Sequence, residues 1–90
     1  MNFKFGKRKT KEIISIKPES LQDFRVIADY LEEGIATCVD FSLLDMEIAG
    51  RLLDMLTGSC YSLKGSISKI AQNVYMILPN GMETSYNGQK

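Results

Sequence analysis

The chain has 90 residues, two cysteines, no histidine and a formal net charge of zero. A chain this short forms one domain, and because small domains bury a limited share of their surface, it is marginally stable alone. Histidine is the commonest general base and metal ligand, and neither a GxGxxG nor a Walker-type glycine pattern occurs, so we expect no enzyme and no cofactor. No apolar run approaches the roughly 18 residues of a membrane span.

The charges are unevenly distributed along the chain. The first eleven residues contain five basic residues and no acid, whereas the remaining residues hold six bases and eleven acids. Since phosphate contacts need a basic surface, we expect no nucleic-acid partner. Residues 1–10 are predicted to be a solvated basic tail; the alternative is weak adhesion of its lysines, with Phe3 and Phe5, to an anionic membrane surface. The isolated Cys38 and Cys60 are typical of reduced thiols, which indicates a cytoplasmic protein.

The first half of the chain predicts a strand, a helix and a second strand. Residues 13–16 are mostly β-branched and precede Pro18, which cannot donate to a strand ladder. Ser20 and Asp23 are typical of a helix start, and apolar residues then recur at helical spacing until Gly34, the expected left-handed position. Residues 35–41 form the second strand, which is apolar on both faces as in a central strand.

A second helix is predicted from about residue 44 to residue 57, begun by Ser42 with Asp45 and ended by Gly58. Its apolar residues cover roughly 180° of a helical wheel, more than one sheet contact requires. Either this helix is deeply buried or part of it contacts another molecule, and we favour the second interpretation for so small a domain.

Three short strands are predicted after the second helix, at residues 61–63, 67–70 and 74–78, the last two joined as an antiparallel hairpin. The order β-α-β-α-β-β-β predicts an α/β sandwich: a five-stranded mixed sheet with two helices. The last strand is apolar on both sides, with Val74, Met76 and Leu78 on one. Because an uncovered apolar sheet face is a liability, we expect a homodimer formed through the sheet.

The residues that begin and end these elements also occur in a recognisable order along the chain. They are Lys17-Pro18, Ile27-Ala28-Asp29, Gly34, Leu44-Asp45, Glu47, Ala49, Arg51, Asp54, Thr57-Gly58, Tyr61-Ser62-Leu63, Gly65-Ser66-Ile67, Lys69-Ile70, Asn73-Val74-Tyr75 and Leu78-Pro79-Asn80. This set, from about Ile13 to Glu83, resembles the globular domain of SepF, a cell-division protein of many Gram-positive bacteria, cyanobacteria and archaea. It divides the chain into a basic tail (1–10), a SepF-like domain (11–83) and a polar tail (84–90).

The resemblance implies a cytoplasmic adaptor at the division site, peripheral to the membrane, that binds the C-terminal tail peptide of FtsZ, the tubulin-like division protein. It implies a partner-binding region at Lys69 and Tyr75, with Asn73 beside them, and a dimer that assembles further with the help of Gly58. Tyr75 replaces the more usual phenylalanine. Family members usually carry an N-terminal amphipathic membrane helix and a linker, whereas only residues 1–10 precede the domain here, so peptide binding is the firmer expectation.

Two other functions compete with this adaptor. One is a self-assembling structural module without a peptide partner, which light scattering with and without the peptide would distinguish. The other is a small-ligand regulatory domain, which needs a concave pocket with converging polar groups. The acidic residues fall mostly on the solvent faces of the predicted helices, so solvated carboxylates explain them better than paired acid–base catalysis does.

Overall fold

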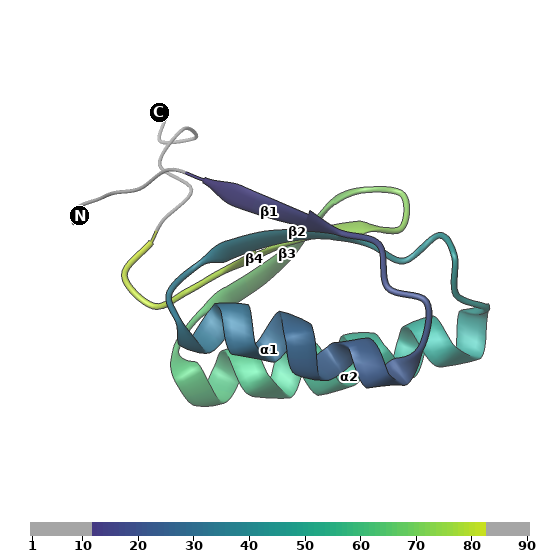
Figure 1. Ribbon diagram of the computed structural model, residues 1–90, viewed down its shortest axis with the longest axis horizontal. Coiled ribbons are helices and arrows are strands. Elements are labelled where there is room, and N and C mark those ends of the chain that lie inside the picture. Colours follow the sequence, from purple (N-terminus) through teal and green to yellow (C-terminus); the bar gives the residue numbers. More distant parts are fainter. Residues whose placement is uncertain (1–11, 83–90) are drawn as a thin grey trace.

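A computed structural model describes residues 12–82 as two layers, a sheet and a pair of helices (Figure 1). The predicted tails, the membrane contact of residues 1–10 included, lie outside these residues. In chain order the elements are β1 (Ile13–Ile16), the short 3-10 helix η2 (Leu21–Asp23), α1 (Phe24–Glu32), β2 (Ala36–Asp40), α2 (Met46–Leu63), β3 (Ser66–Ala71) and β4 (Val74–Leu78).

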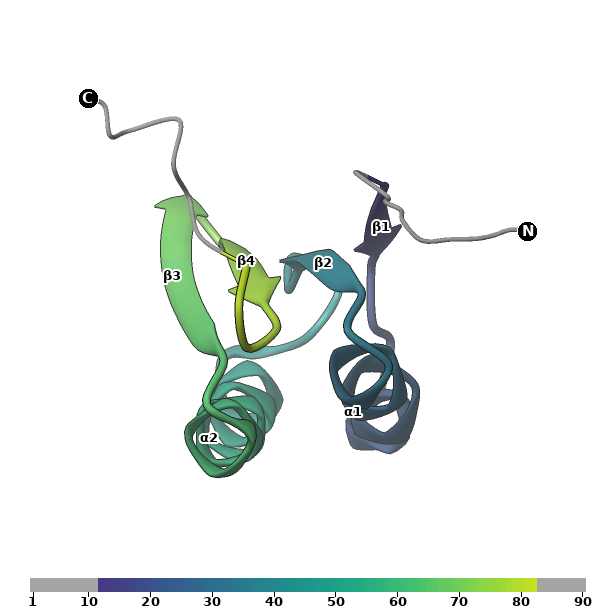
Figure 2. The ribbon, with the colours of Figure 1, turned by 90° about the vertical axis from the view of Figure 1, so that its left-hand side faces the viewer.

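The sheet has four strands in the order β1-β2-β4-β3. Strand β1 is parallel to β2, and β4 is antiparallel to both of its neighbours, so the sheet is mixed as predicted. The prediction of a fifth strand is wrong within residues 12–82, because residues 61–63 belong to helix α2. Both helices cover the same side of the sheet (Figure 2). The face on the other side is called the open face below.

The start and end of α1 follow the sequence prediction closely. The Ser20 hydroxyl accepts the Gln22 N–H, and the Asp23 carboxylate accepts the N–H groups of Glu19 and Ser20. This capping arrangement begins a 3-10 turn that continues as α1. After α1, Gly34 has a φ of +82°, which other residues rarely adopt.

Helix α2 differs from the prediction at both ends. Its N-cap is Asp45 alone, whose Oδ1 accepts the Ile48 N–H at 2.9 Å. Gly58 does not end the helix: α2 continues to Leu63, and Lys64 takes the left-handed conformation there with a φ of 62°. The helix continues because Leu52, Leu56 and Cys60 recur every four residues and are all buried against the sheet. That burial outweighs the roughly 1 kcal/mol helix penalty of one glycine.

The core lies between the sheet and the two helices. Its buried members are Ile27, Leu31, Val39, Phe41, Leu52, Leu56, Cys60 and Ile77. Helix α2 returns to the sheet through Gly65, where a Cβ would collide with the backbone carbonyl oxygen of Leu78. A glycine is therefore required at this close approach of two backbone segments.

Candidate partner-binding site

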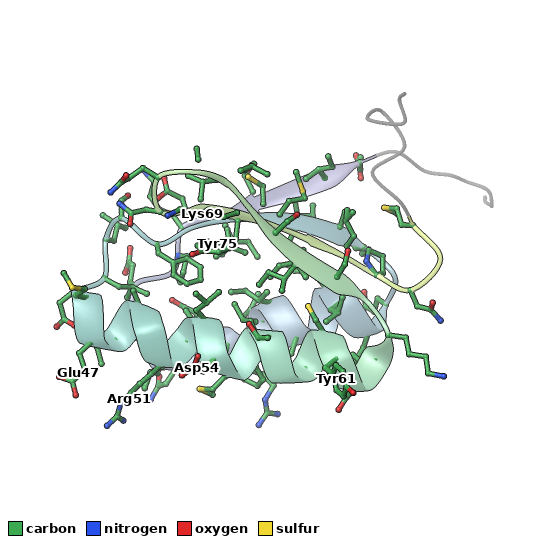
Figure 3. The ribbon with its side chains drawn as sticks, turned by 180° about the vertical axis from the view of Figure 1, so that it is seen from behind. Glu47, Arg51, Asp54, Tyr61, Lys69 and Tyr75 are labelled. Carbon is green, nitrogen blue, oxygen red and sulfur yellow. The ribbon has the colours of Figure 1, made fainter. Side chains whose placement is uncertain are left out.

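The structure brings Lys69 and Tyr75 together as direct cross-strand partners of the β3–β4 hairpin. Two residues away on the same strands, Ile67 pairs with Ile77, and both contribute to the core. Since side chains alternate along a strand, Lys69 and Tyr75 point to the helix side of the sheet. Lys69 is exposed and Tyr75 half-buried. Figure 3 shows both above the part of α2 that carries Arg51 and Asp54. The pair thus places a cation beside an aromatic ring near the first half of α2.

The ring of Tyr75 is supported from within the domain. Its centroid lies 5.4 Å from that of Phe41, with a tilt of 35° between the rings. Phe41 is buried in the core. Tilted aromatic pairs at this distance are favourable, and a tyrosine has few rotatable bonds to immobilise on binding. Tyr75 is therefore a rigid, partly exposed anchor of the kind found at binding hot spots.

Asn73 has a structural role in the turn between the two strands. Its φ is 64°, in the left-handed region that asparagine tolerates better than most residues. Its backbone carbonyl accepts the Phe41 N–H at 2.7 Å. A register shift between Lys69 and Ala71 marks a β-bulge just before the turn. The backbone of Asn73 thus holds together the elements that carry Tyr75 and Phe41.

The residues expected to mediate self-association through the sheet lie on its open face. Val74, Met76 and Leu78 alternate with Tyr75 and Ile77, so they point away from the helices. Val74 and Met76 are half-buried, whereas Leu78 is already buried, with 6% of its surface exposed. Cys38, half-buried, lies opposite Met76 on the neighbouring strand. This face is thus a largely uncharged surface of small and apolar side chains.

Gly58, the other residue expected to mediate self-association, lies within α2 on its exposed side. The prediction that Gly58 ends the helix with a positive φ is wrong, because the residue that ends α2 with a positive φ is Lys64. A Cβ at Gly58 would meet no atom within 4 Å. The residue borders a groove of about 480 Å3 between the two helices, lined by Phe24, Glu32, Met55, Gly58, Ser59, Ser62 and Leu63. No contact within the domain therefore requires a glycine at position 58.

The titratable groups of the described part show two shifts. Hydrogen bonding from Ser42, and then the Lys17 ammonium 4.0 Å away, lowers the pKa of the Asp40 carboxyl. Burial raises the pKa of the Cys60 thiol. Both cysteines are free thiols, Cys60 buried and Cys38 half-buried. Within residues 12–82, no three Cys, Asp or Glu side chains cluster closely enough to hold a metal ion.

None of the helices among the described residues has the length and apolar character needed to cross a membrane.

Sequence reasoning missed the loop that joins β2 to α2. Phe41 supports Tyr75 from this loop. Leu43 in the loop and Met46 at the start of α2 have side chains that are exposed to solvent. Leu43-Leu44 could have indicated this exposure, because two successive apolar residues before a helix cap cannot both point to the same core. By its spacing Met46 belongs to the apolar stripe predicted for the second helix, but it is exposed, because the buried face has not yet begun in the first turn.

Comparison with known proteins identifies the family. The model of the family "Cell division protein SepF" matches residues 13–83. The SepF of Lachnospira eligens is 32% identical over 74 residues, which are 82% of this chain and 40% of the relative. That of Clostridium beijerinckii is 32% identical over 76 residues, 84% of this chain and 51% of the relative. The chain thus spans about half the length of the curated relatives it matches.

Solved structures agree on the fold. A SepF-like protein from Archaeoglobus fulgidus superposes with a TM-score of 0.76 at 19% identity, covering 83% of this chain and 93% of the other. SepF from Methanobrevibacter smithii, solved in complex with FtsZ-CTD, superposes with a TM-score of 0.68 at 21% identity, covering 81% and 95%. Family match and fold agree over the same residues, and the chain belongs to the SepF family of cell division proteins.

Proposed function

We propose that this chain is a cell-division adaptor that binds the C-terminal peptide of FtsZ through Lys69 and Tyr75. The observation that carries the proposal is the direct pairing of these two side chains across the hairpin, with Phe41 behind the tyrosine ring. Lys69 can meet a carboxylate of the peptide, and Tyr75 offers an apolar face with a polar tip. The complex of the M. smithii relative with FtsZ-CTD supports this choice of partner. Asn73 contributes through its backbone, which holds the hairpin turn against Phe41.

The proposal also includes self-association at two separate surfaces. The open face of the sheet, at Val74 and Met76, supports a homodimer because it is apolar and uncovered by the two helices (Figure 2). Leu78 lies on the same face, but it is already buried and so offers little surface to a partner. Gly58 supports a second contact along the groove between α1 and α2, because a glycine allows another chain to approach the helix closely. Such an adaptor acts in the cytoplasm at the division site.

The test is a calorimetric titration of the FtsZ tail peptide against this protein and its variants. Tyr75→Ala should weaken binding by on the order of 1–3 kcal/mol, and Lys69→Glu should weaken it with the fold intact, because Lys69 is exposed. Lys64→Glu is the matched control, an exposed lysine that ends helix α2 two residues before strand β3 begins, away from the hairpin turn. Unfolding curves of each variant separate lost contacts from lost folding. Unchanged affinity in both Tyr75→Ala and Lys69→Glu would refute the assignment of the site.

A self-assembling module without a peptide partner is the second candidate. The uncovered open face favours it, because that face requires no peptide to explain it. Light scattering with and without the FtsZ peptide distinguishes the two functions. If the protein assembles in light scattering but gives no heat of binding when titrated with the peptide, the second candidate is favoured.

A further inference from the structure

Three acidic side chains lie close together in sequence at the end of helix α1. Asp29, Glu32 and Glu33 are all exposed, and the last turn of this helix contains no basic residue. Within residues 12–82, none of the three forms an ion pair. The C-terminal end of a helix carries a partial negative charge, so acids are unfavourable there and a cation is favourable. The end of α1 therefore presents negative charge that the described domain does not balance.

The groove between the two helices extends from this acidic end. Glu32 lines it together with residues from the last turns of α2, and its volume is about 480 Å3. Met55, which is 41% exposed, and Leu63, which is 37% exposed, contribute apolar surface to it, as does Phe24 at the start of α1. The groove thus combines exposed apolar side chains with a carboxylate at one end.

The chain enters the described domain beside this end of α1. Strand β1 starts at Ile13, which pairs with Ala36, the third residue after Glu33. Three residues span at most about 11 Å and paired strands lie about 5 Å apart, so Ile13 begins within about 16 Å of Glu33. Figure 1 shows the start of β1 at the same end of the domain as the C-terminal ends of both helices.

The sequence that precedes β1 complements the groove in charge and in apolar character. Residues 1–11 contain five basic residues and no acid, together with the aromatic Phe3 and Phe5. Phe5 is eight residues before Ile13 and can therefore lie up to about 26–29 Å from it. Helix α1 has nine residues and is only about 14 Å long. The segment is thus long enough to reach the groove while its basic residues remain near the acidic end of α1.

We infer that residues 1–11 bind the groove between α1 and α2 of their own chain. The basic residues contact Glu32 and Glu33, and the two phenylalanines pack against the apolar lining of the groove. Because the segment is tethered to the domain, its effective concentration is in the millimolar range, so an intrinsic Kd of about 1 mM is enough to fill half of the grooves. A few exposed ion pairs and one packed ring are sufficient for that affinity.

The inference goes beyond the proposed function and adds a condition to one part of it. Gly58 borders the same groove, so bound residues 1–11 and a neighbouring copy compete for the surface around it. Association at Gly58 therefore requires residues 1–11 to leave the groove, whereas binding of the FtsZ peptide at Lys69 and Tyr75 does not.

The test uses fluorescence, because the chain contains no tryptophan and Phe5→Trp introduces a single probe. Its emission maximum should lie at a shorter wavelength than that of the double variant Phe5→Trp/Met55→Glu, in which the groove carries a charge. Val26→Glu, added to Phe5→Trp, is the matched control and should leave the emission unchanged, because Val26 is 47% exposed on α1 and does not line the groove. Equal unfolding midpoints show that each variant is folded.

A second arm tests the charges at the end of α1. Adding Glu32→Gln/Glu33→Gln to Phe5→Trp should shift the emission to longer wavelength. The matched control Glu47→Gln/Asp54→Asn, which removes two acids from the exposed side of α2, should not shift it. The emission should also be independent of protein concentration, because the segment binds its own chain.

Three results would overturn the inference. One is equal emission with and without Met55→Glu; a shift on adding phosphatidylglycerol vesicles would then assign residues 1–11 to a membrane surface instead. The second is an emission shift that grows with protein concentration, which would place the segment on another copy. The third is an equal effect of the two pairs of acid substitutions. Calorimetry with the FtsZ peptide tests the proposed function separately, because Lys69 and Tyr75 do not line this groove.

Discussion

Replacing Gly58 by alanine is expected to stabilise this domain. Gly58 lies inside helix α2, it is exposed, and an added Cβ meets no atom within 4 Å. Glycine in a helix interior is less stable than alanine by roughly 0.5–1 kcal/mol, because glycine loses more backbone freedom on folding. For a domain of this size, that gain raises the midpoint of thermal unfolding by about 2–8 °C.

The same helix supplies the control. Gly50 is also exposed within α2, and a Cβ there also meets no atom within 4 Å. Gly50→Ala and Gly58→Ala should therefore give similar gains in urea denaturation. The curves are recorded at two protein concentrations, because association adds to apparent stability. Analytical ultracentrifugation of Gly58→Lys should show weaker self-association, whereas Gly50→Lys should associate normally.

Two results would contradict this reasoning. A loss of stability in Gly58→Ala that is not seen in Gly50→Ala would show that position 58 requires a glycine for the fold itself. Normal oligomer size in Gly58→Lys would show that no neighbouring chain approaches the helix closely at that point.

Three further predictions concern the interior. The Thr37 hydroxyl is buried and has no hydrogen-bond partner in the described structure, so Thr37→Val should raise the free energy of unfolding by about 1 kcal/mol in urea denaturation; a loss would indicate a hidden partner. Gly65→Ala should lower it by about 2–4 kcal/mol, because the new Cβ collides with the Leu78 carbonyl oxygen, and a loss below 0.5 kcal/mol would show that the backbone adjusts easily. Burial raises the pKa of the Cys60 thiol. The contribution of this thiol to the free energy of unfolding is therefore complete below the unfolded thiol pKa of about 8.5. It is lost as the pH rises through the thiol pKa of the folded protein. Iodoacetamide should therefore label Cys38 before Cys60 in mass spectrometry, and Cys60→Val should reduce the loss of stability at alkaline pH.

The first half of the fold could be predicted because local chemistry and tertiary structure agree there. Ser20 with Asp23 begins the first helix, and Gly34 provides the positive φ after it, as their residue types indicate. Pro18 likewise follows the first strand without interrupting it. Each of these positions depends on the residue's own backbone preference, so no distant contact is needed to predict it.

The prediction failed at residues 58–63 because a tertiary contact outweighs a local preference. Gly58 is a common helix terminator, and Tyr61-Ser62-Leu63 is compatible with a strand. The helix nevertheless continues, because burial of Cys60 requires another turn against the sheet. The actual end uses Lys64 in the left-handed conformation, followed by Gly65, whose role depends on the distant Leu78. A sequence read locally contains no information on that contact.

The candidate site was predictable only in part. The resemblance indicated Lys69 and Tyr75, which belong to the two strands of the predicted hairpin. Their direct pairing depends on the bulge before the turn, which shifts the register by one residue. The support from Phe41 depends on where the loop after β2 passes, which spacing along the chain does not indicate.

Under the proposed function, the layered arrangement has a consequence for how strongly the protein can bind a polymer of its partner. The open face of the sheet and the outer side of the helices point in opposite directions, and the hairpin site lies at one end between them (Figures 1 and 2). Neighbours on either side would leave the peptide site accessible. Each added copy would then bring another weak peptide contact to the same filament, so avidity could exceed the affinity of one site by roughly 10²–10⁴ without any new contact.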